Sequence, residues 1–206
     1  HRVMCGDSTK IDDVEKLMDG KKADMVFTDP PYNVDFMSRK NKKHALDYTS
    51  KPYKDDRSPE EWANFLNDVF GNISAFMKSG ACFYIWGADR TVVSYYEFEK
   101  KLDWLFHKII VWDKDWSFLN RKDLLAQNEF CIYGWKRGAN RYFNRMNYSD
   151  IWKIKKENPN KMVHSAQKPV ELVCMALKMS AKGEDIILDV FLGSGSTLIA
   201  CEKTNR

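Results

Sequence analysis

The chain of 206 residues has no apolar run long enough to cross a bilayer, and its first residues do not form a signal peptide. Its five cysteines include no Cys-x-x-Cys pair, and its four histidines show no metal-ligand spacing. We therefore expect no membrane segment, no metal site and the reduced thiols of a cytoplasmic protein. The length and a hydrophobic content of 44% predict a single folded domain over residues 1–206.

The net charge of +4 is small, but it is unevenly distributed along the chain. Residues 37–57 carry +4 and residues 136–161 carry +6, which leaves −6 for the remainder. Two basic segments on an acidic body indicate a binding surface for a polyanion. The alternative is that both segments are solvated loops with ordinary lysines. If the polyanion is DNA, the candidate contacts are Arg39, Lys40, Lys42, Lys43, Arg137 and Arg141.

Hydrophobic patterning predicts strands that alternate with helices, which is typical of an α/β fold with a mostly parallel sheet. The expected strands are residues 3–7, 23–28, 81–86, 106–112, 130–135, 151–154 and 185–190. The expected helices are residues 11–18, 58–80 and 87–101, with two more that begin at Pro169 and Ser196. The second of these helices has the clearest start, because Ser58 and Glu61 match a capping box.

The most informative motif is Asp29-Pro30-Pro31-Tyr32, which follows the apolar strand expected at 23–28. Each proline lacks an N–H group and has a fixed φ, and Pro31 also keeps Pro30 out of the helical region. The carbonyl groups of Asp29 and Pro30 are therefore not taken up by a helix. The motif predicts a rigid pocket with a carboxylate, free acceptors and an aromatic ring, and the alternative is a purely structural turn.

A second candidate site is the turn Gly193-Ser194-Gly195, which joins the strand expected at 185–190 to a helix. Glycines allow a ligand to approach the backbone closely, and the N-terminus of a helix favours an anion. The sequence has no third glycine at the dinucleotide spacing and no P-loop lysine. A carboxylate, such as the methionine end of S-adenosylmethionine, fits this turn better than a pyrophosphate. Asp189 is then expected near the ligand's ammonium group.

Taken together, these motifs resemble the S-adenosylmethionine-dependent DNA amino methyltransferases, which modify adenine N6 or cytosine N4. The DPPY motif comes first and Phe191-x-Gly193-x-Gly195 comes last, which is the circularly permuted order of the β group. Gly6-Asp7 and the segments 128–135 and 164–171 also resemble motifs of this family. The resemblance implies a Rossmann-like methyltransferase fold, an α/β fold with a mostly parallel sheet and helices on both faces.

The resemblance also implies a role for each motif. The target amine donates hydrogen bonds to the Asp29 carboxylate and the Pro30 carbonyl, which localise its lone pair, while Tyr32 stacks on the flipped base. The implied catalytic residues are Asp29, Pro30, Pro31 and Tyr32. The implied cofactor-binding residues are Asp7, Lys168, Asp189, Phe191, Gly193, Gly195 and Ser196. For Lys168 the alternative is a solvated lysine at a helix start, and Trp86, Trp112, Phe130 and Trp135 are expected in the core.

The implied activity is site-specific methylation of double-stranded DNA in a restriction-modification context. Adenine N6 is expected over cytosine N4 because Asp29 opens the motif. RNA or protein methylation, and a relative that binds nucleic acid without catalysis, are the alternatives. A homodimer is also expected, since dimers are frequent in the β group. The sequence starts at His1 and stops before the strand that binds the cofactor ribose in the family, so we expect a longer protein.

Overall fold

The computed structural model describes residues 1–33, 56–115, 123–155 and 167–206. Within these residues one sheet has the strand order β5-β3-β4-β2-β1-β6. The strands are β1 (Ala23–Thr28), β2 (Met77–Gly87), β3 (Trp104–Asp113), β4 (Asn128–Lys136), β5 (Ile151–Lys153) and β6 (Ile187–Leu188). The helices are α1 (Ile11–Met18), α2 (Pro59–Ala75), α3 (Asp89–Tyr95), α4 (Phe98–Lys101), α5 (Val170–Ser180) and α6 (Ser196–Thr204).

The strand directions confirm a mostly parallel sheet. β1 is parallel to both β2 and β6, and β3 is parallel to β5. β4 is antiparallel to both of its neighbours, β2 and β3. Among the described strands, β4 alone therefore runs against the others. The carboxyl ends of β1, β2, β3 and β6 and the start of β4 consequently lie at the same edge of the sheet, which we call the carboxyl edge.

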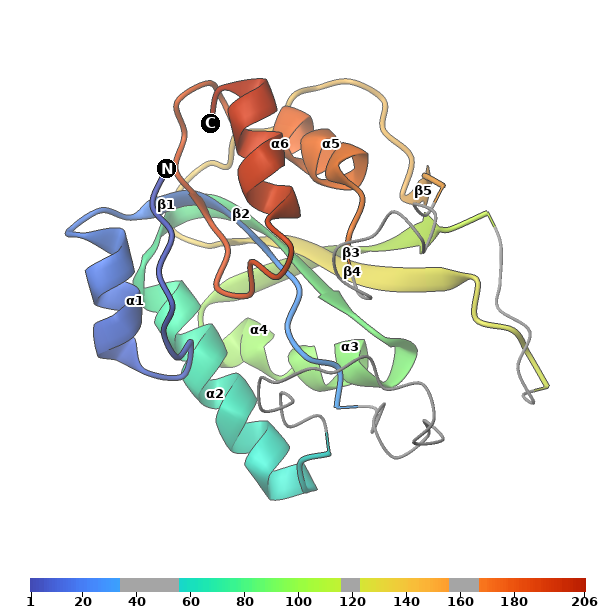
Figure 1. Ribbon diagram of the computed structural model, residues 1–206, viewed down its shortest axis with the longest axis horizontal. Helices are drawn as coiled ribbons and strands as arrows, with labels where there is room; N and C mark the ends of the chain where they lie inside the picture. The colour runs from blue at the N-terminus through green and yellow to red at the C-terminus, as the bar shows by residue number, and fades with distance from the viewer. Residues whose placement is uncertain (34–55, 116–122, 156–166) are drawn as a thin grey trace.

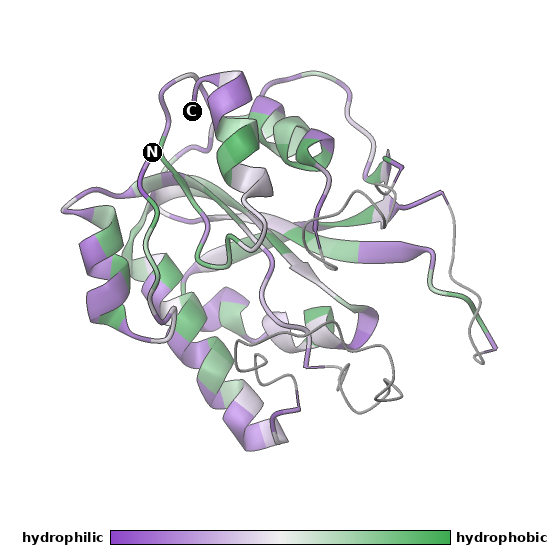
Figure 2. Ribbon diagram, in the orientation of Figure 1, coloured by the Kyte–Doolittle hydropathy of each residue, from purple (hydrophilic) through white to green (hydrophobic). Residues whose placement is uncertain are grey.

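Helices cover both faces of the sheet: α1 to α4 lie on one face, and α5 and α6 lie on the other (Figure 1). Side chains of β2 alternate between the two cores, with Phe83 and Ile85 facing α2 and with Tyr84 and Trp86 facing α5. Figure 2 shows hydrophobic residues gathered along the strands and hydrophilic residues on the outer side of α1. The expectation that tryptophans build the core is confirmed for Trp86 and Trp112, which are fully buried. Phe130 and Trp135 are partly buried and pack against the same cores.

Helix α2 begins as predicted. The Ser58 hydroxyl accepts a hydrogen bond from the Glu61 N–H, and the Glu61 carboxylate accepts one from the Ser58 N–H. The predicted end at Gly80 is wrong, because the helix ends at Ala75 and the chain enters β2 at once. Strand pairing between Met77 and Ala23 takes precedence over the helical pattern here. Gly80 lies inside β2 at a φ of +81°, a backbone conformation that suits glycine.

Three other predicted elements differ from the structure. Residues 3–7 form no strand, and Asp7 instead sits in the turn before α1, where its carboxylate accepts the Thr9 N–H. The strand expected at 185–190 is reduced to Ile187–Leu188, because Asp185 and Asp189 bond to the backbones of the turns on either side. The helix expected at 87–101 is divided into α3 and α4 by a turn at residues 96–97.

Candidate active site

The carboxyl edge of the sheet brings together side chains from four separate parts of the chain. Asp29 and Tyr32 follow β1, Glu129 lies at the start of β4, and Lys168 comes just before α5. Lys114, which follows β3, completes this group. We call these five residues the ionic cluster. Asp29 and Lys168 are 139 residues apart in the sequence, so only the fold places them in contact.

Lys168 is the centre of the ionic cluster. Its Nζ lies 2.5 Å from Asp29 Oδ2, 2.9 Å from the Tyr32 hydroxyl and 2.9 Å from Glu129 Oε2. The Tyr32 hydroxyl donates to Asp29 Oδ1 over 2.6 Å. Lys168 is only 8% exposed, so the alternative of a solvated lysine at a helix start is wrong. A contact between its side chain and the cofactor stays a prediction.

Glu129 and Lys114 are the two members of the cluster that have no role predicted from the sequence, and Glu129 makes the contact with Lys168. Its Oε2 accepts from Lys168, and its Oε1 lies 3.3 Å from the ammonium of Lys114. The sequence identifies the segment 128–135 only by its family resemblance. A glutamate at the start of a strand is otherwise expected to be a solvated side chain. The signal that could have identified Glu129 is its place directly before a buried apolar strand.

Burial and ion pairing shift the pKa values of the cluster in opposite directions. Burial raises the pKa of Asp29, although the ammonium of Lys168 opposes this shift. Burial alone would also raise the pKa of Glu129, but Lys168 and Lys114 together lower it to about 2. Burial and the nearby Asp29 carboxylate raise the pKa of Tyr32 well above its usual value, so its hydroxyl remains a donor at neutral pH. Negative charge is therefore held more firmly on Glu129 than on Asp29.

Asp189 lies next to the DPPY motif. Its carboxylate accepts hydrogen bonds from the hydroxyl groups of Thr28, over 3.0 Å, and Thr197, over 2.6 Å. It also accepts the backbone N–H of Phe191 over 3.0 Å. Burial raises the pKa of Asp189 to about 6, although these three hydrogen bonds oppose the shift. Since Thr28 directly precedes Asp29, the two predicted sites are adjacent in the fold.

The glycine turn has the backbone conformation that its sequence predicts. Gly193 and Gly195 have φ values of +55° and +85°, which residues with a side chain rarely adopt. Ser196 opens α6, and its hydroxyl donates to the backbone carbonyl of Lys168 over 2.6 Å. The ring of Phe191 packs against Phe65 of α2. The turn is thus tied both to the start of α5 and to the helix on the opposite face of the sheet.

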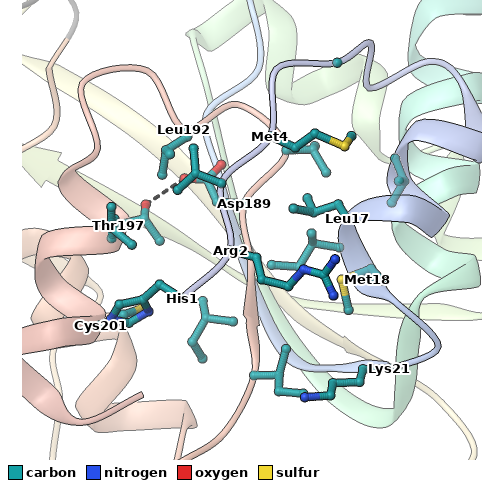
Figure 3. Close-up of a pocket in the computed structure, with 18 of the residues that line it drawn as sticks. His1, Arg2, Met4, Leu17, Met18, Lys21, Asp189, Leu192, Thr197 and Cys201 are labelled. Atoms are coloured by element: carbon teal, nitrogen blue, oxygen red, sulfur yellow. Dashed lines mark hydrogen bonds between the residues drawn. The ribbon is translucent and has the colours of Figure 1, made fainter.

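A cavity of about 370 Å³ lies between the N-terminal segment, α1, β6 and α6. Met4, Leu17 and Met18 line one side, and Asp189, Leu192 and Thr197 line the other (Figure 3). Two of the predicted cofactor residues, Asp7 and Asp189, belong to its wall. The other five, Lys168, Phe191, Gly193, Gly195 and Ser196, are not among the lining residues. The apolar residues Val3 and Met4 of this wall do not form the strand that the sequence predicts, and the sequence does not predict their place in a cavity.

Of the six predicted DNA contacts, the structure describes Arg137 and Arg141, and it does not bring these two together with the ionic cluster. Arg39, Lys40, Lys42 and Lys43 lie outside the described residues. Arg137 follows the end of β4, at the opposite edge of the sheet, where its guanidinium pairs with Glu99 and donates to the Trp104 carbonyl. The guanidinium of Arg141 lies 3.9 Å above the Trp135 ring, toward the same edge. DNA contact by Arg137 and Arg141 stays a prediction, but it concerns a surface remote from Asp29.

Metal-binding groups and membrane-spanning helices are both absent from the described part of the chain. No group of three or more His, Cys, Asp and Glu side chains is placed to hold a metal ion there. No helix among residues 1–33, 56–115, 123–155 and 167–206 is long and apolar enough to span a bilayer.

A family model described as DNA methylase matches residues 23–206 of this chain. The type II methyltransferase M.HindIII of Haemophilus influenzae is 36% identical over 90 residues, which are 43% of this chain and 27% of that protein. M2.MboI of Moraxella bovis, also a type II methyltransferase, is 25% identical over 193 residues, which are 86% of this chain and 71% of that protein. The match thus spans about a quarter of the first relative's length and about seven tenths of the second's.

Solved structures show the same fold. The complex of M1.HpyAVI with S-adenosylmethionine superposes with a TM-score of 0.70 at 21% identity, covering 100% of this chain and 90% of that one. The cytosine-N4-specific PvuII DNA methyltransferase gives a TM-score of 0.67 at 14% identity, covering 98% and 77%. The methyl donor of this family is S-adenosylmethionine. Because the family model matches most of its length, this chain belongs to the N6/N4 family of DNA amino methyltransferases.

Proposed function

We propose that this protein transfers the methyl group of S-adenosylmethionine to an exocyclic amine of double-stranded DNA, with adenine N6 as the acceptor. The observation that carries the proposal is the hydrogen bond from Thr28 to Asp189. It joins the strand end that presents Asp29 to the wall of the cavity described above. The carboxylate of Asp29, which can accept a hydrogen bond from an amine, is therefore connected through Thr28 and Asp189 to a cavity that suits the methyl donor.

The residues of the DPPY motif would activate the amine rather than attack the donor themselves. An exocyclic amine is a poor nucleophile because its lone pair is delocalised into the ring. Hydrogen bonds to the Asp29 carboxylate and the Pro30 carbonyl would localise the lone pair on nitrogen and orient it. Positioning and electrostatics then supply most of the rate. Asp29, whose pKa is raised by burial, is suited to accept the amine proton after transfer.

The cavity fits the methyl donor in size and in chemistry. A volume of about 370 Å³ lies in the range of small-molecule sites. Asp189 and Asp7 offer carboxylates, while Met4, Leu17 and Leu192 offer an apolar surface for a flat ring. Gly193 and Gly195 would allow the donor's carboxylate to approach the N-terminus of α6. When bound, S-adenosylmethionine supplies an electrophilic methyl group on sulfur.

Adenine is proposed because the motif begins with Asp29, whereas family members that begin it with Ser tend to modify cytosine. The fold alone does not discriminate, since the cytosine-N4-specific PvuII enzyme has the same fold. The test is to incubate the protein with labelled S-adenosylmethionine and mixed-sequence duplex DNA, and to digest the product to nucleosides. N6-methyladenine is the expected product. N4-methylcytosine would overturn the choice of base, and label in RNA or protein with inert DNA would overturn the substrate.

We further propose that residues 1–206 form one catalytic domain and that the protein is a homodimer. We also propose that four basic residues contact the DNA backbone: Arg39, Lys40, Lys42 and Lys43. Removing a phosphate contact weakens binding to every DNA sequence. It also lowers the slope of log affinity against log salt concentration, here called the salt slope, by about one. Lys40→Ala is therefore expected to lower both affinity and salt slope, and an unchanged slope would reject this contact. Sedimentation equilibrium tests the dimer.

A further inference from the structure

We propose that Lys168 occupies the amine position of Asp29 while no base is bound, and that Glu129 is the positioning residue that retains Lys168 when the target amine displaces it. The inference rests on the proposed function, because it concerns the same amine and the same carboxylate. It assigns a task to Glu129 and Lys114, which the DPPY motif does not include.

The first step is that both oxygens of Asp29 are already in use. Oδ1 accepts the Tyr32 hydroxyl over 2.6 Å, and Oδ2 accepts the Lys168 ammonium over 2.5 Å. A lysine ammonium is an N–H donor, as is the amine of a base. Each carboxylate oxygen can accept two hydrogen bonds, so an amine that takes the place of the Lys168 ammonium on Oδ2 has to displace that ammonium.

The second step is that Lys168 is the donor that can move. Its ammonium has three hydrogens, and the three acceptors are Asp29, Tyr32 and Glu129. Glu129 Oε2 already lies 2.9 Å from this ammonium, so Lys168 can leave Asp29 and remain paired with a carboxylate. The Lys168 backbone stays in place, because its carbonyl accepts the Ser196 hydroxyl. Only the flexible side chain has to rotate.

The third step is that Lys168 has to retain a carboxylate after this movement. Its side chain is 8% exposed, so a displaced ammonium would remain buried, and an unpaired buried charge is strongly unfavourable. Among the described residues Glu129 is the second carboxylate in contact with it. Lys114 pairs with the other oxygen of Glu129, which leaves Oε2 directed at Lys168. Together these contacts form a chain of alternating charge, Asp29–Lys168–Glu129–Lys114.

The same contacts would be present if the ionic cluster only stabilised the fold, but the loss of Glu129 would then affect base recognition differently. If Glu129 only stabilised the fold, its loss would weaken the binding of all duplexes alike. If Glu129 retains a displaced Lys168, its loss would selectively weaken the binding of a base that carries an amine. An amine-free base does not compete with Lys168 for Asp29.

The experiment compares two duplexes that contain the methylation site mapped with the wild-type protein. One carries the normal target base, and the other carries the same base with hydrogen in place of the exocyclic amine. The wild type should prefer the amine-bearing duplex. In Glu129→Gln this preference should fall by about tenfold to a hundredfold, because moving Lys168 would leave a buried charge unpaired. Thermal unfolding confirms that the variant is folded.

A double variant tests whether the lost preference in Glu129→Gln comes from the unpaired Lys168 ammonium. Glu129→Gln combined with Lys168→Met lacks both the ammonium that occupies Asp29 and the carboxylate that retains it. The preference for the amine-bearing duplex should therefore return. Glu97→Gln, which removes an exposed partner of Lys101 on another surface, is the matched control and should keep the wild-type ratio. An unchanged ratio in Glu129→Gln, or no recovery in the double variant, would overturn the inference while the proposed function stands. If the wild type methylates no DNA, the proposed function and this inference are both wrong.

Discussion

The hydroxyl of Ser196 donates a 2.6 Å hydrogen bond to the backbone carbonyl of Lys168, whose ammonium lies 2.5 Å from Asp29. One residue thereby connects the glycine turn at the start of α6 with the DPPY motif at the end of β1. The Thr28 to Asp189 hydrogen bond makes a second connection between the same two regions. The predicted cofactor turn and the predicted catalytic motif are thus connected by hydrogen bonds at two places.

Asp29→Ala should abolish methyl transfer, with a loss of at least about a hundredfold, because the target amine loses its carboxylate acceptor. DNA binding should remain largely intact, since phosphate contacts supply most of the affinity. Transfer of labelled methyl and a binding titration measure the two effects. Asp24→Ala is the matched control, because Asp24 of β1 also pairs with a lysine, Lys78 of β2, but lies at the other edge of the sheet. Wild-type transfer by Asp29→Ala would show that the catalytic assignment is wrong.

The raised pKa of Asp189 predicts a specific pH dependence of stability. The folded protein holds the proton up to about pH 6, whereas the unfolded carboxyl releases it near 3.8. The raised pKa therefore stabilises the folded state fully below pH 3.8, the unfolded value. This stabilisation is lost as the pH rises through about 6, the folded value. The stability difference between wild type and Asp189→Asn should accordingly fall by up to about 3 kcal/mol from about pH 4 to about pH 7. Urea unfolding at several pH values measures it, and a pH-independent difference would contradict the burial of this carboxyl.

Gly195→Ala should lower the free energy of unfolding by about 1–2 kcal/mol, because position 195 has a φ of +85°. No atom lies within 4 Å of the added methyl group, so the cost is in the backbone conformation and not in a clash. Gly71→Ala is the control, since Gly71 is helical and also has open space around it. That substitution should raise stability by about 0.5–1 kcal/mol. Equal effects of the two variants in urea unfolding would refute the conformational argument.

Arg137→Ala should reduce stability more than DNA binding. The guanidinium of Arg137 joins the end of β4 to Glu99 and to the Trp104 carbonyl, and these bonds should be worth about 1–3 kcal/mol together. If Arg137 also contacts a DNA phosphate, as the sequence predicts, the salt slope of DNA binding should fall by about one. An unchanged slope would reject Arg137 as a DNA contact.

Much of this protein follows from short-range patterns in its sequence. Strand β1, helix α1 and the start of α2 follow from apolar spacing and from the Ser58 and Glu61 capping pair, which act within a few residues. The DPPY motif and the positive φ values at Gly193 and Gly195 are local properties as well. Their order along the chain was sufficient to predict the family.

Other features depend on residues that only the tertiary structure brings together. Lys114 belongs to no motif, and the motif around Glu129 predicts no role for its side chain. The Lys168–Glu129–Lys114 contacts arise because the start of β4 meets the end of β1 at one edge of the sheet. Val3, Met4, Gly6 and Asp7 line a cavity instead of forming a strand, since no strand among the described residues pairs with them. Local sequence selects backbone conformations and turns within a few residues. Burial, and with it the charge of Asp29, Glu129 and Lys168, is decided by which distant segments exclude water together.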